Sequence, residues 1–292
     1  MTAATDAPVT IVTLDGTICP SEAPLLYADD LAALRGDGVF ETLLVRDGAA
    51  CLLDAHLQRL ARSAGLMDLP APDMAAWRHA VDVAVRQWTD GQTGEGALRL
   101  IYSRGRESGS GPTGYAMVTP LPGRIAAARR DGVAALTLDR GLSANGTDAM
   151  PWLLAGAKTL SYAVNMAALR YAAGRGADDV IFVSSDGYVL EGPRSTVVIA
   201  DRGTLRTPPL SQPILRGTTQ QALFDAAEAK GYDCVYGPLR LVDLAVAADV
   251  WLVSSITLAA RVHTLDGTKL RPQVPDAQFA GLLDAAVAGP SR

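Results

Sequence analysis

Cysteine and histidine are both scarce in this chain of 292 residues, which contains three of each. The cysteines, Cys19, Cys51 and Cys234, are odd in number, lie far apart and include no CxxC pair. This pattern predicts neither a disulfide framework nor a zinc site, and we expect no bound metal. A chain without structural disulfides is typical of a reducing compartment.

Long hydrophobic runs and clusters of positive charge are also missing. No apolar run approaches the roughly 18 residues of a membrane-spanning helix, and the first ten residues lack the basic and apolar segments of a signal peptide. The net charge of −5 at pH 7 is spread along the chain. Because nucleic-acid and membrane-surface proteins need clustered Lys and Arg, we expect a cytoplasmic protein that acts on small molecules.

The composition that is present, 49% hydrophobic and 20% charged residues, is that of an ordinary globular protein with room for two domains. Strand-like and helical patterns alternate in both halves, which predicts mixed α/β domains. Two prolines, a glycine and basic residues break the pattern in PLPGRIAAARR (120–130). We therefore predict a smaller N-terminal domain over 1–122, a linker over 123–130 and a larger C-terminal domain over 131–292.

One stretch of the second half, residues 179–219, combines an acid with a helix start. Two apolar runs flank Asp186 and Gly187, which predicts a hairpin that Glu191 closes, and a helical pattern begins after Arg216. A carboxylate attracts a protonated ring nitrogen, and a helix N-terminus attracts phosphate. The two features suit opposite ends of pyridoxal phosphate, although a surface acid and an ordinary helix cap explain them equally simply.

A single lysine, Lys158, lies among apolar neighbours in LLAGAKTL (153–160), before a helical pattern that reaches Tyr171. A lysine that forms a Schiff base must be neutral part of the time, and apolar surroundings favour the neutral form. The alternative is a lysine that extends from a helix end into solvent. By itself the pattern permits a catalytic lysine without requiring one.

Seven segments occur in one order along the chain. They are GDGVFETLLVRDG (36–48), HLQRL (56–60), LRLIYSRG (98–105), Lys158 with its helix, ADDVIFVSSDGYVLEGPRSTV (177–197), ILRGTT (214–219) and WLVSSIT (251–257). In this order they resemble the fold-type IV pyridoxal-phosphate enzymes, the class IV aminotransferase family. The resemblance covers nearly the whole chain and implies two α/β domains with the cofactor between them.

The resemblance implies a role for each matching residue. Lys158 would be the Schiff-base lysine and the proton shuttle, and Glu191 the counter-ion of the pyridine N–H, which keeps the ring an electron sink. Arg59 would pair with the phosphate. The other expected cofactor contacts are Ser195, Leu215, Gly217, Thr218, Thr219 and Ser255. The resemblance also implies a homodimer, with the 103–114 loop or the 26–40 region of one subunit reaching the other's site.

The reaction is predicted from the loops that would meet the substrate. GVFET (38–42) and LLDAHLQRL (52–60) are most similar to the 4-amino-4-deoxychorismate lyases, which release 4-aminobenzoate and pyruvate in folate biosynthesis. Thr113 and Thr196 depart from the residues usual in the family. The alternatives are D-amino-acid or branched-chain aminotransferase activity, and cofactor binding without turnover. For an amine substrate bearing carboxylates, the candidate contacts are Phe40, Arg99, Arg104 and Arg261.

Overall fold

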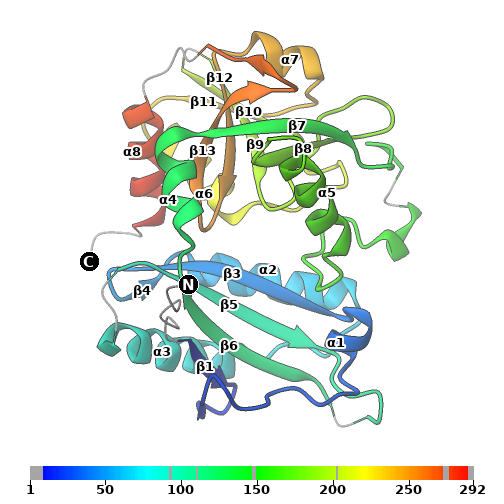
Figure 1. The fold of residues 1–292 in the computed structure, drawn as a ribbon, viewed down its shortest axis with the longest axis vertical. Helices are drawn as coiled ribbons and strands as arrows, with labels where there is room; N and C mark the ends of the chain where they lie inside the picture. Colours follow the sequence, from blue (N-terminus) through cyan, green and yellow to red (C-terminus); the bar gives the residue numbers. More distant parts are fainter. Residues whose placement is uncertain are drawn as a thin grey trace. The chain divides into compact units, whose positions relative to one another are not determined.

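The computed structural model describes residues 9–91, 94–109, 111–146, 149–201, 203–271 and 276–288. The chain forms two compact units (Figure 1). Unit 1 comprises Met1–Pro122 and Ala157–Ser161, and unit 2 comprises Gly123–Gly156 and Tyr162–Arg292. Each unit has its own sheet, helices and hydrophobic core, which agrees with the predicted mixed α/β class.

Unit 1 contains a six-stranded antiparallel sheet with the strand order β2-β1-β6-β5-β3-β4. Its strands are β1 (Thr10–Thr13), β2 (Ile18–Cys19), β3 (Gly38–Arg46), β4 (Ala49–Ala50), β5 (Gly96–Ser103) and β6 (Thr113–Pro120). Its helices are α1 (Leu31–Arg35), α2 (Leu53–Leu66) and α3 (Met74–Gly91). The segment GVFETLLVR forms the nine-residue strand β3, which pairs with β5 along its length and with the short edge strand β4 at its end.

The core of unit 1 lies where α2 packs on β3 and α3 packs on β1 and β6. Alternate β3 residues point to opposite faces of the sheet, so Val39, Glu41 and Leu43 face the helices while Phe40 and Thr42 lie on the other face. The N-terminus of α3 is capped as its sequence predicts, because Asp73 Oδ1 accepts hydrogen bonds from the amides of the first helical turn. One consequence of the β3 pattern is that a carboxylate, that of Glu41, is buried in the core.

Unit 2 contains an eight-stranded mixed sheet with the order β11-β10-β9-β12-β13-β7-β8, and β14 pairs with β13 beside this path. Its strands are β7 (Val133–Asp139), β8 (Asp179–Val183), β9 (Thr196–Asp201), β10 (Thr204–Thr207), β11 (Asp233–Tyr236), β12 (Asp249–Ser254), β13 (Leu258–Leu265) and β14 (Thr268–Lys269). The pairs β10–β11, β13–β7 and β7–β8 are parallel, and the others are antiparallel.

Helices cover the unit 2 sheet. They are α4 (Gly123–Asp131), the short 3-10 helix η2 (Pro151–Leu153), α5 (Ala163–Ala173), α6 (Thr218–Glu228), α7 (Leu241–Val246) and α8 (Asp276–Val287). Helix α5 packs on β8, α4 on β13, and α6 packs against both α8 and β12. The Trp251 ring of β12 stacks on the Phe279 ring of α8, with 4.3 Å between their centroids. One side of the C-terminal helix α8 is therefore buried.

Two local expectations are wrong. Residues 123–130 are not a linker, because they form most of α4, which packs on β13. Lys158 does not belong with the C-terminal unit that was expected to carry it, because the segment Ala157–Ser161 clusters with unit 1.

The described residues of the loop that follows β5 contact the segment before α1. Arg106 forms an ion pair with Asp29 (Nε–Oδ1 2.7 Å), and its guanidinium lies 4.2 Å from the centre of the Tyr27 ring. Asp30 accepts hydrogen bonds from the hydroxyl groups of Ser103 and Thr113. The two loops of unit 1 therefore pack as one assembly.

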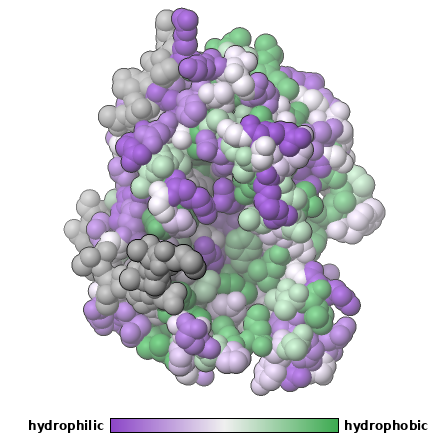
Figure 2. Space-filling model, in the orientation of Figure 1, coloured by the Kyte–Doolittle hydropathy of each residue, from purple (hydrophilic) through white to green (hydrophobic). Residues whose placement is uncertain are grey.

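The surface is mixed in character. On the face drawn in Figure 2, hydrophobic side chains reach the surface in patches among hydrophilic ones. Among the described helices, none combines the length and the apolar character that crossing a lipid bilayer requires. In all the described parts of the chain, no three His, Cys, Asp or Glu side chains lie close enough together to hold a metal ion.

Candidate functional site

Lys158 lies in a strand-like segment that is hydrogen-bonded to the start of β3. The Phe40 N–H donates to the Lys158 carbonyl (3.0 Å), and the Leu160 N–H donates to the Gly38 carbonyl (2.8 Å). On its other side the Lys158 N–H donates to Ser63 Oγ of α2 (3.1 Å). The main chain of Lys158 is thus held on both sides, several residues before the helix that the sequence pattern placed next to it.

The side chain of Lys158 reaches the Phe40 ring, with Nζ 4.4 Å from the ring centre. An aromatic face attracts an ammonium group, so this contact orients Nζ. The chain contains three lysines, and the other two, Lys230 and Lys269, are exposed. Lys158 is therefore the lysine whose surroundings suit a covalent and proton-transfer role.

Arg59 forms a buried ion pair with Glu41 that the sequence analysis did not foresee. Its Nε donates to Glu41 Oε1 and its Nη2 to Oε2, both at 2.7 Å. His56 Nδ1 lies 2.7 Å from the same Oε2 atom. Glu41 is fully buried, and His56 and Arg59 are nearly so. The missed signal was a carboxylate at an inward-facing position of β3.

The charges of this cluster are coupled. Burial alone would raise the pKa of Glu41, but the adjacent Arg59 guanidinium and His56 outweigh it and hold that pKa well below its usual value. Burial lowers the pKa of His56, and the attraction of Glu41 only partly opposes this because Arg59 already neutralises that carboxylate. Glu41 is thus ionised and His56 neutral, with the Nδ1 hydrogen donated to Glu41.

Glu191 occupies the position in unit 2 that the hairpin pattern predicted. Its main chain continues the pairing of β8, because the Phe182 N–H donates to the Glu191 carbonyl (2.8 Å). Its carboxylate Oε2 accepts a hydrogen bond from the Leu215 N–H (3.0 Å). Leu215, expected to touch the cofactor, therefore holds Glu191 through its main chain, and the carboxylate is only partly buried.

The loop after Glu191 is fixed by residues that the sequence analysis did not single out. The Tyr162 hydroxyl and the Asn165 side-chain amide both donate to the Pro193 carbonyl. Burial, helped by the nearby charge of Glu191, raises the pKa of Tyr162 to about 12. This phenol therefore stays protonated and remains a donor at neutral pH.

The N-terminus of α6 is buried and lined with hydroxyl groups. Thr218 and Thr219 are 7% and 2% exposed, and Thr219 Oγ1 donates to Ser255 Oγ at 3.3 Å. The first amides of an α-helix have no acceptor within the helix, so a buried helix start suits an anion. Gly217 is needed here, because a Cβ at this position would lie 2.4 Å from Thr196 Oγ1.

Ser195 carries a buried hydroxyl for which the described residues supply no hydrogen-bond partner. It lies beside Gly192, where an added Cβ would come within 2.2 Å of Ser195 Oγ. Buried hydroxyl groups without a partner are rare in folded proteins. The Ser195 hydroxyl is therefore suited to a polar ligand atom, in line with its predicted place among the cofactor contacts.

The chemistry of these residues fits the groups of pyridoxal phosphate. A helix start with hydroxyl groups and an oriented arginine suit the phosphate, a carboxylate held by a main-chain amide suits a protonated ring nitrogen, and Lys158 suits the aldehyde carbon. Lys158 and Arg59 belong to unit 1, whereas Glu191, Ser195 and the α6 residues belong to unit 2.

The four predicted substrate residues differ in their surroundings. Arg99 of β5 lies directly opposite Thr42 of β3, on the sheet face that carries Phe40. Burial lowers the pKa of Arg99, and its Nη1 donates to Thr119 Oγ1 at 3.0 Å. Arg99 and Phe40 thus share one face of the unit 1 sheet, and the Phe40 ring contacts Lys158.

Arg104 and Arg261 each have a carboxylate partner within the protein. Arg104 Nε lies 2.7 Å from Asp37 Oδ2, and its remaining nitrogens donate to the main-chain carbonyls of Met67 and Asp68. Arg261 Nε lies 3.1 Å from Asp249 Oδ1. Both ion pairs are contacts within the protein. These contacts link neither arginine to Lys158 or to the α6 N-terminus.

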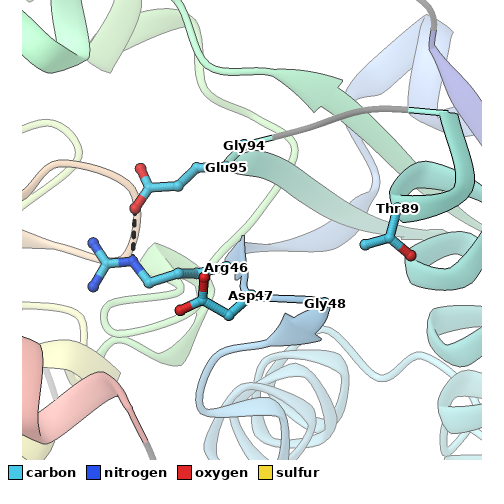
Figure 3. A pocket seen from close by; sticks show the side chains of 6 residues that line it. All are labelled: Arg46, Asp47, Gly48, Thr89, Gly94 and Glu95. Carbon is cyan, nitrogen blue, oxygen red and sulfur yellow. Dashed lines mark hydrogen bonds and ion pairs between the residues drawn. The ribbon is translucent and has the colours of Figure 1, made fainter.

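A surface pocket of unit 1 is separate from these residues. Figure 3 shows its lining side chains, which come from the β3–β4 turn, from α3 and from the start of β5; they are Arg46, Asp47, Gly48, Thr89, Gly94 and Glu95. Arg46 and Glu95 form an ion pair there at 2.6 Å. Phe40 is six residues away along β3, roughly 20 Å in an extended strand, so this pocket is not where Lys158 lies.

The buried histidine predicts a pH dependence of stability. The unfolded chain protonates His56 below pH 6.5, whereas the folded protein keeps it neutral, so stability is lost as the pH falls below 6.5. Between pH 7.5 and 5.5 we expect the free energy of unfolding to fall by about 1 kcal/mol. His56→Asn should flatten this dependence in urea titrations, while the exposed-site variant His79→Asn should keep it. An unchanged slope in His56→Asn would contradict the assignment.

Comparisons with known proteins agree with this geometry. The family model of amino-transferase class IV matches residues 38–265. The chain is 67% identical over 285 residues, 95% of its length and 98% of the relative, to the bifunctional aminodeoxychorismate lyase / D-amino acid transaminase of Mycobacterium tuberculosis.

Two solved structures of a hypothetical aminotransferase from Mycobacterium tuberculosis are also similar to this chain. Its PLP-bound form has a TM-score of 0.94 at 67% identity, covering 96% of this chain and 99% of the other. Its alpha-ketoglutarate and PMP bound form has a TM-score of 0.94 at 68% identity, covering 95% and 98%. The predicted resemblance and the predicted cofactor of the family are thereby confirmed, and the chain belongs to the class IV aminotransferases, the fold-type IV pyridoxal-phosphate enzymes.

Proposed function

We propose that this chain binds pyridoxal 5′-phosphate and uses Lys158 as its catalytic residue. The observation that carries the proposal is the fixed position of Lys158, whose main chain is hydrogen-bonded to β3 and α2 and whose Nζ lies over the Phe40 ring. Lys158 would hold the cofactor covalently. Arg59, Thr218, Thr219 and Ser255 would bind the phosphate, Glu191 the ring nitrogen and Ser195 a further polar atom.

In the reaction, the residues of this chain position groups and move a proton. The bound cofactor supplies an electron-withdrawing ring that stabilises negative charge on the substrate carbon. Lys158 Nζ, once released from the cofactor, takes a proton from that carbon and returns one where the reaction requires it. The Phe40 ring keeps Nζ oriented, and Glu191 keeps the ring nitrogen protonated.

Two reactions are proposed for this site. One is the conversion of 4-amino-4-deoxychorismate to 4-aminobenzoate and pyruvate, in which aromatisation of the ring drives the loss of the enolpyruvyl group. The other is transamination of D-amino acids. Both are supported by the 67% identical relative, whose name gives both activities, and both need the same proton transfer by Lys158. Branched-chain transamination has no comparable support.

Arg99 is the proposed contact for a substrate carboxylate. It lies on the sheet face that carries Phe40, whose ring contacts Lys158. Arg104 and Arg261 are not proposed for this role, because Asp37 and Asp249 already pair with them. The bound alpha-ketoglutarate of the solved relative is a dicarboxylate, which an arginine of this kind would recognise.

Product assays test the proposed reactions. With aminodeoxychorismate, we expect 4-aminobenzoate and pyruvate in equal amounts, and with D-alanine and 2-oxoglutarate we expect pyruvate and D-glutamate. Lys158→Ala should lower both rates by at least about 10²-fold, and Lys230→Ala should lower neither. D-alanine turnover without any 4-aminobenzoate would refute the lyase activity, and faster turnover of L-leucine than of D-alanine would refute the D-amino-acid assignment.

The same assays include a variant pair for the carboxylate contact. Arg99→Gln should raise the KM for 2-oxoglutarate by about tenfold or more, because it removes a charge-assisted hydrogen bond. Arg104→Gln is the matched control: it breaks the Asp37 pair of unit 1 and should lower thermal stability without a comparable change in KM. A larger KM effect from Arg104→Gln would reverse the assignment.

A homodimer is proposed as the functional assembly. Unit 2 exposes several large apolar side chains on α5 and η2; they are Trp152 (71%), Val164 (53%), Met166 (41%) and Tyr171 (47%). Exposed apolar groups of this size on neighbouring elements are typical of subunit contacts. Sedimentation equilibrium should give about twice the chain mass of 30.5 kDa, and a monomer at micromolar concentration would contradict the proposal.

A further inference from the structure

Glu41 is a buried charge that the proposed reaction does not use. The alternation of β3 turns its side chain toward α2, among the core residues Val39 and Leu43. It is 0% exposed. Because an ionised carboxylate is costly to bury, its partners must compensate for the lost water.

The partners of Glu41 come from one face of α2. His56 and Arg59 are three residues apart, so their side chains project from neighbouring positions of the helix. Arg59 Nε and Nη2 donate to the two carboxylate oxygens, and His56 Nδ1 shares Oε2 with Arg59. The Thr42 N–H also points at Oε2, at 3.3 Å. The carboxylate therefore has contacts on both of its oxygens.

This pairing fixes the orientation of the guanidinium. Arg59 carries five N–H donors in a planar fork, and Glu41 takes the edge formed by Nε and Nη2. The opposite edge, which includes Nη1, is directed away from Glu41. A long side chain that would otherwise have many rotamers is thereby held in one of them before any ligand binds.

The pairing also sets the charge of the cluster. Glu41 and Arg59 neutralise one another. The His56 imidazole is neutral, with its one hydrogen on Nδ1, and so adds no charge. A buried, unpaired guanidinium would be strongly unfavourable. The carboxylate thus lets the Arg59 guanidinium remain in the core of unit 1 in one fixed orientation.

We propose that Glu41 and His56 are positioning residues that hold Arg59 with its Nη1 edge toward the phosphate of the cofactor. This inference rests on the proposed function, in which Arg59 binds that phosphate. The competing interpretation is that the ion pair only ties β3 to α2 and contributes nothing to ligand binding. The two differ in whether loss of Glu41 affects the phosphate specifically.

The test compares two ligands that differ only in the phosphate. Equilibrium dissociation constants of pyridoxal 5′-phosphate and of pyridoxal are measured on the apo protein by dialysis, and the ratio of the two isolates the contribution of the phosphate. Glu41→Gln keeps the shape of the side chain and removes its charge. We expect it to reduce the preference for the phosphorylated ligand by about tenfold, and Arg59→Gln to reduce it by about tenfold or more.

Two further variants distinguish a loss of Arg59 positioning from a general loss of stability. Glu41→Gln leaves a guanidinium without its counter-ion and destabilises the fold, so His56→Asn, which retains both charges, provides a second measurement and should reduce the preference about threefold. Leu57→Ala, a core residue of the same helix, is the control for general destabilisation. It should lower the melting temperature and leave the preference unchanged.

The outcomes separate the two levels of inference. If Arg59→Gln leaves the preference unchanged, Arg59 does not bind the phosphate, and both the proposed cofactor contact and the positioning role fail. If Arg59→Gln abolishes the preference while Glu41→Gln and His56→Asn match the wild type, only the positioning role fails. A loss of preference in Leu57→Ala equal to that in Glu41→Gln would also overturn it.

Discussion

The hydrogen bonds between the Lys158 segment and the start of β3 are the constraint on which the site of unit 1 depends. They fix the main chain of Lys158 at Phe40 and Gly38, and the alternation of β3 then assigns each neighbour to a face. Phe40 and Thr42, which lies opposite Arg99, are on the sheet face where Lys158 contacts the Phe40 ring. Glu41 points the other way, into the core with His56 and Arg59. One strand therefore positions both the Lys158 amine and the buried arginine.

Unit 2 contributes a different kind of chemistry, based on main-chain groups. The Leu215 amide holds the Glu191 carboxylate, and the α6 N-terminus offers amides and hydroxyl groups at a buried position where only glycine fits before the helix. Such groups are placed by the fold itself, so they need little reorganisation when an anionic ligand binds. A cofactor with a phosphate and a basic ring nitrogen uses both features.

Local sequence signals predicted several elements of this fold and part of the site. The hairpin around Gly187 and the Asp73 cap follow from turn and capping chemistry that involves neighbouring residues, and the α6 start follows from the helical pattern after Arg216. Lys158 and Arg59 came from the family resemblance. Long-range contacts were not predictable: the pairing of the Lys158 segment with β3 joins residues more than a hundred positions apart, and Glu41 joins its α2 partners across the core. Likewise, α4 forms where a linker was expected because it packs on β13.

The central claim, that Lys158 is the residue that holds the cofactor, can be tested directly because the chain has three lysines. The protein is incubated with pyridoxal 5′-phosphate, reduced with borohydride, digested and mapped by mass spectrometry. The account predicts a phosphopyridoxyl group on the peptide that contains Lys158 and none on those with Lys230 or Lys269. Labelling at either of these exposed lysines, with Lys158 unmodified, would contradict it.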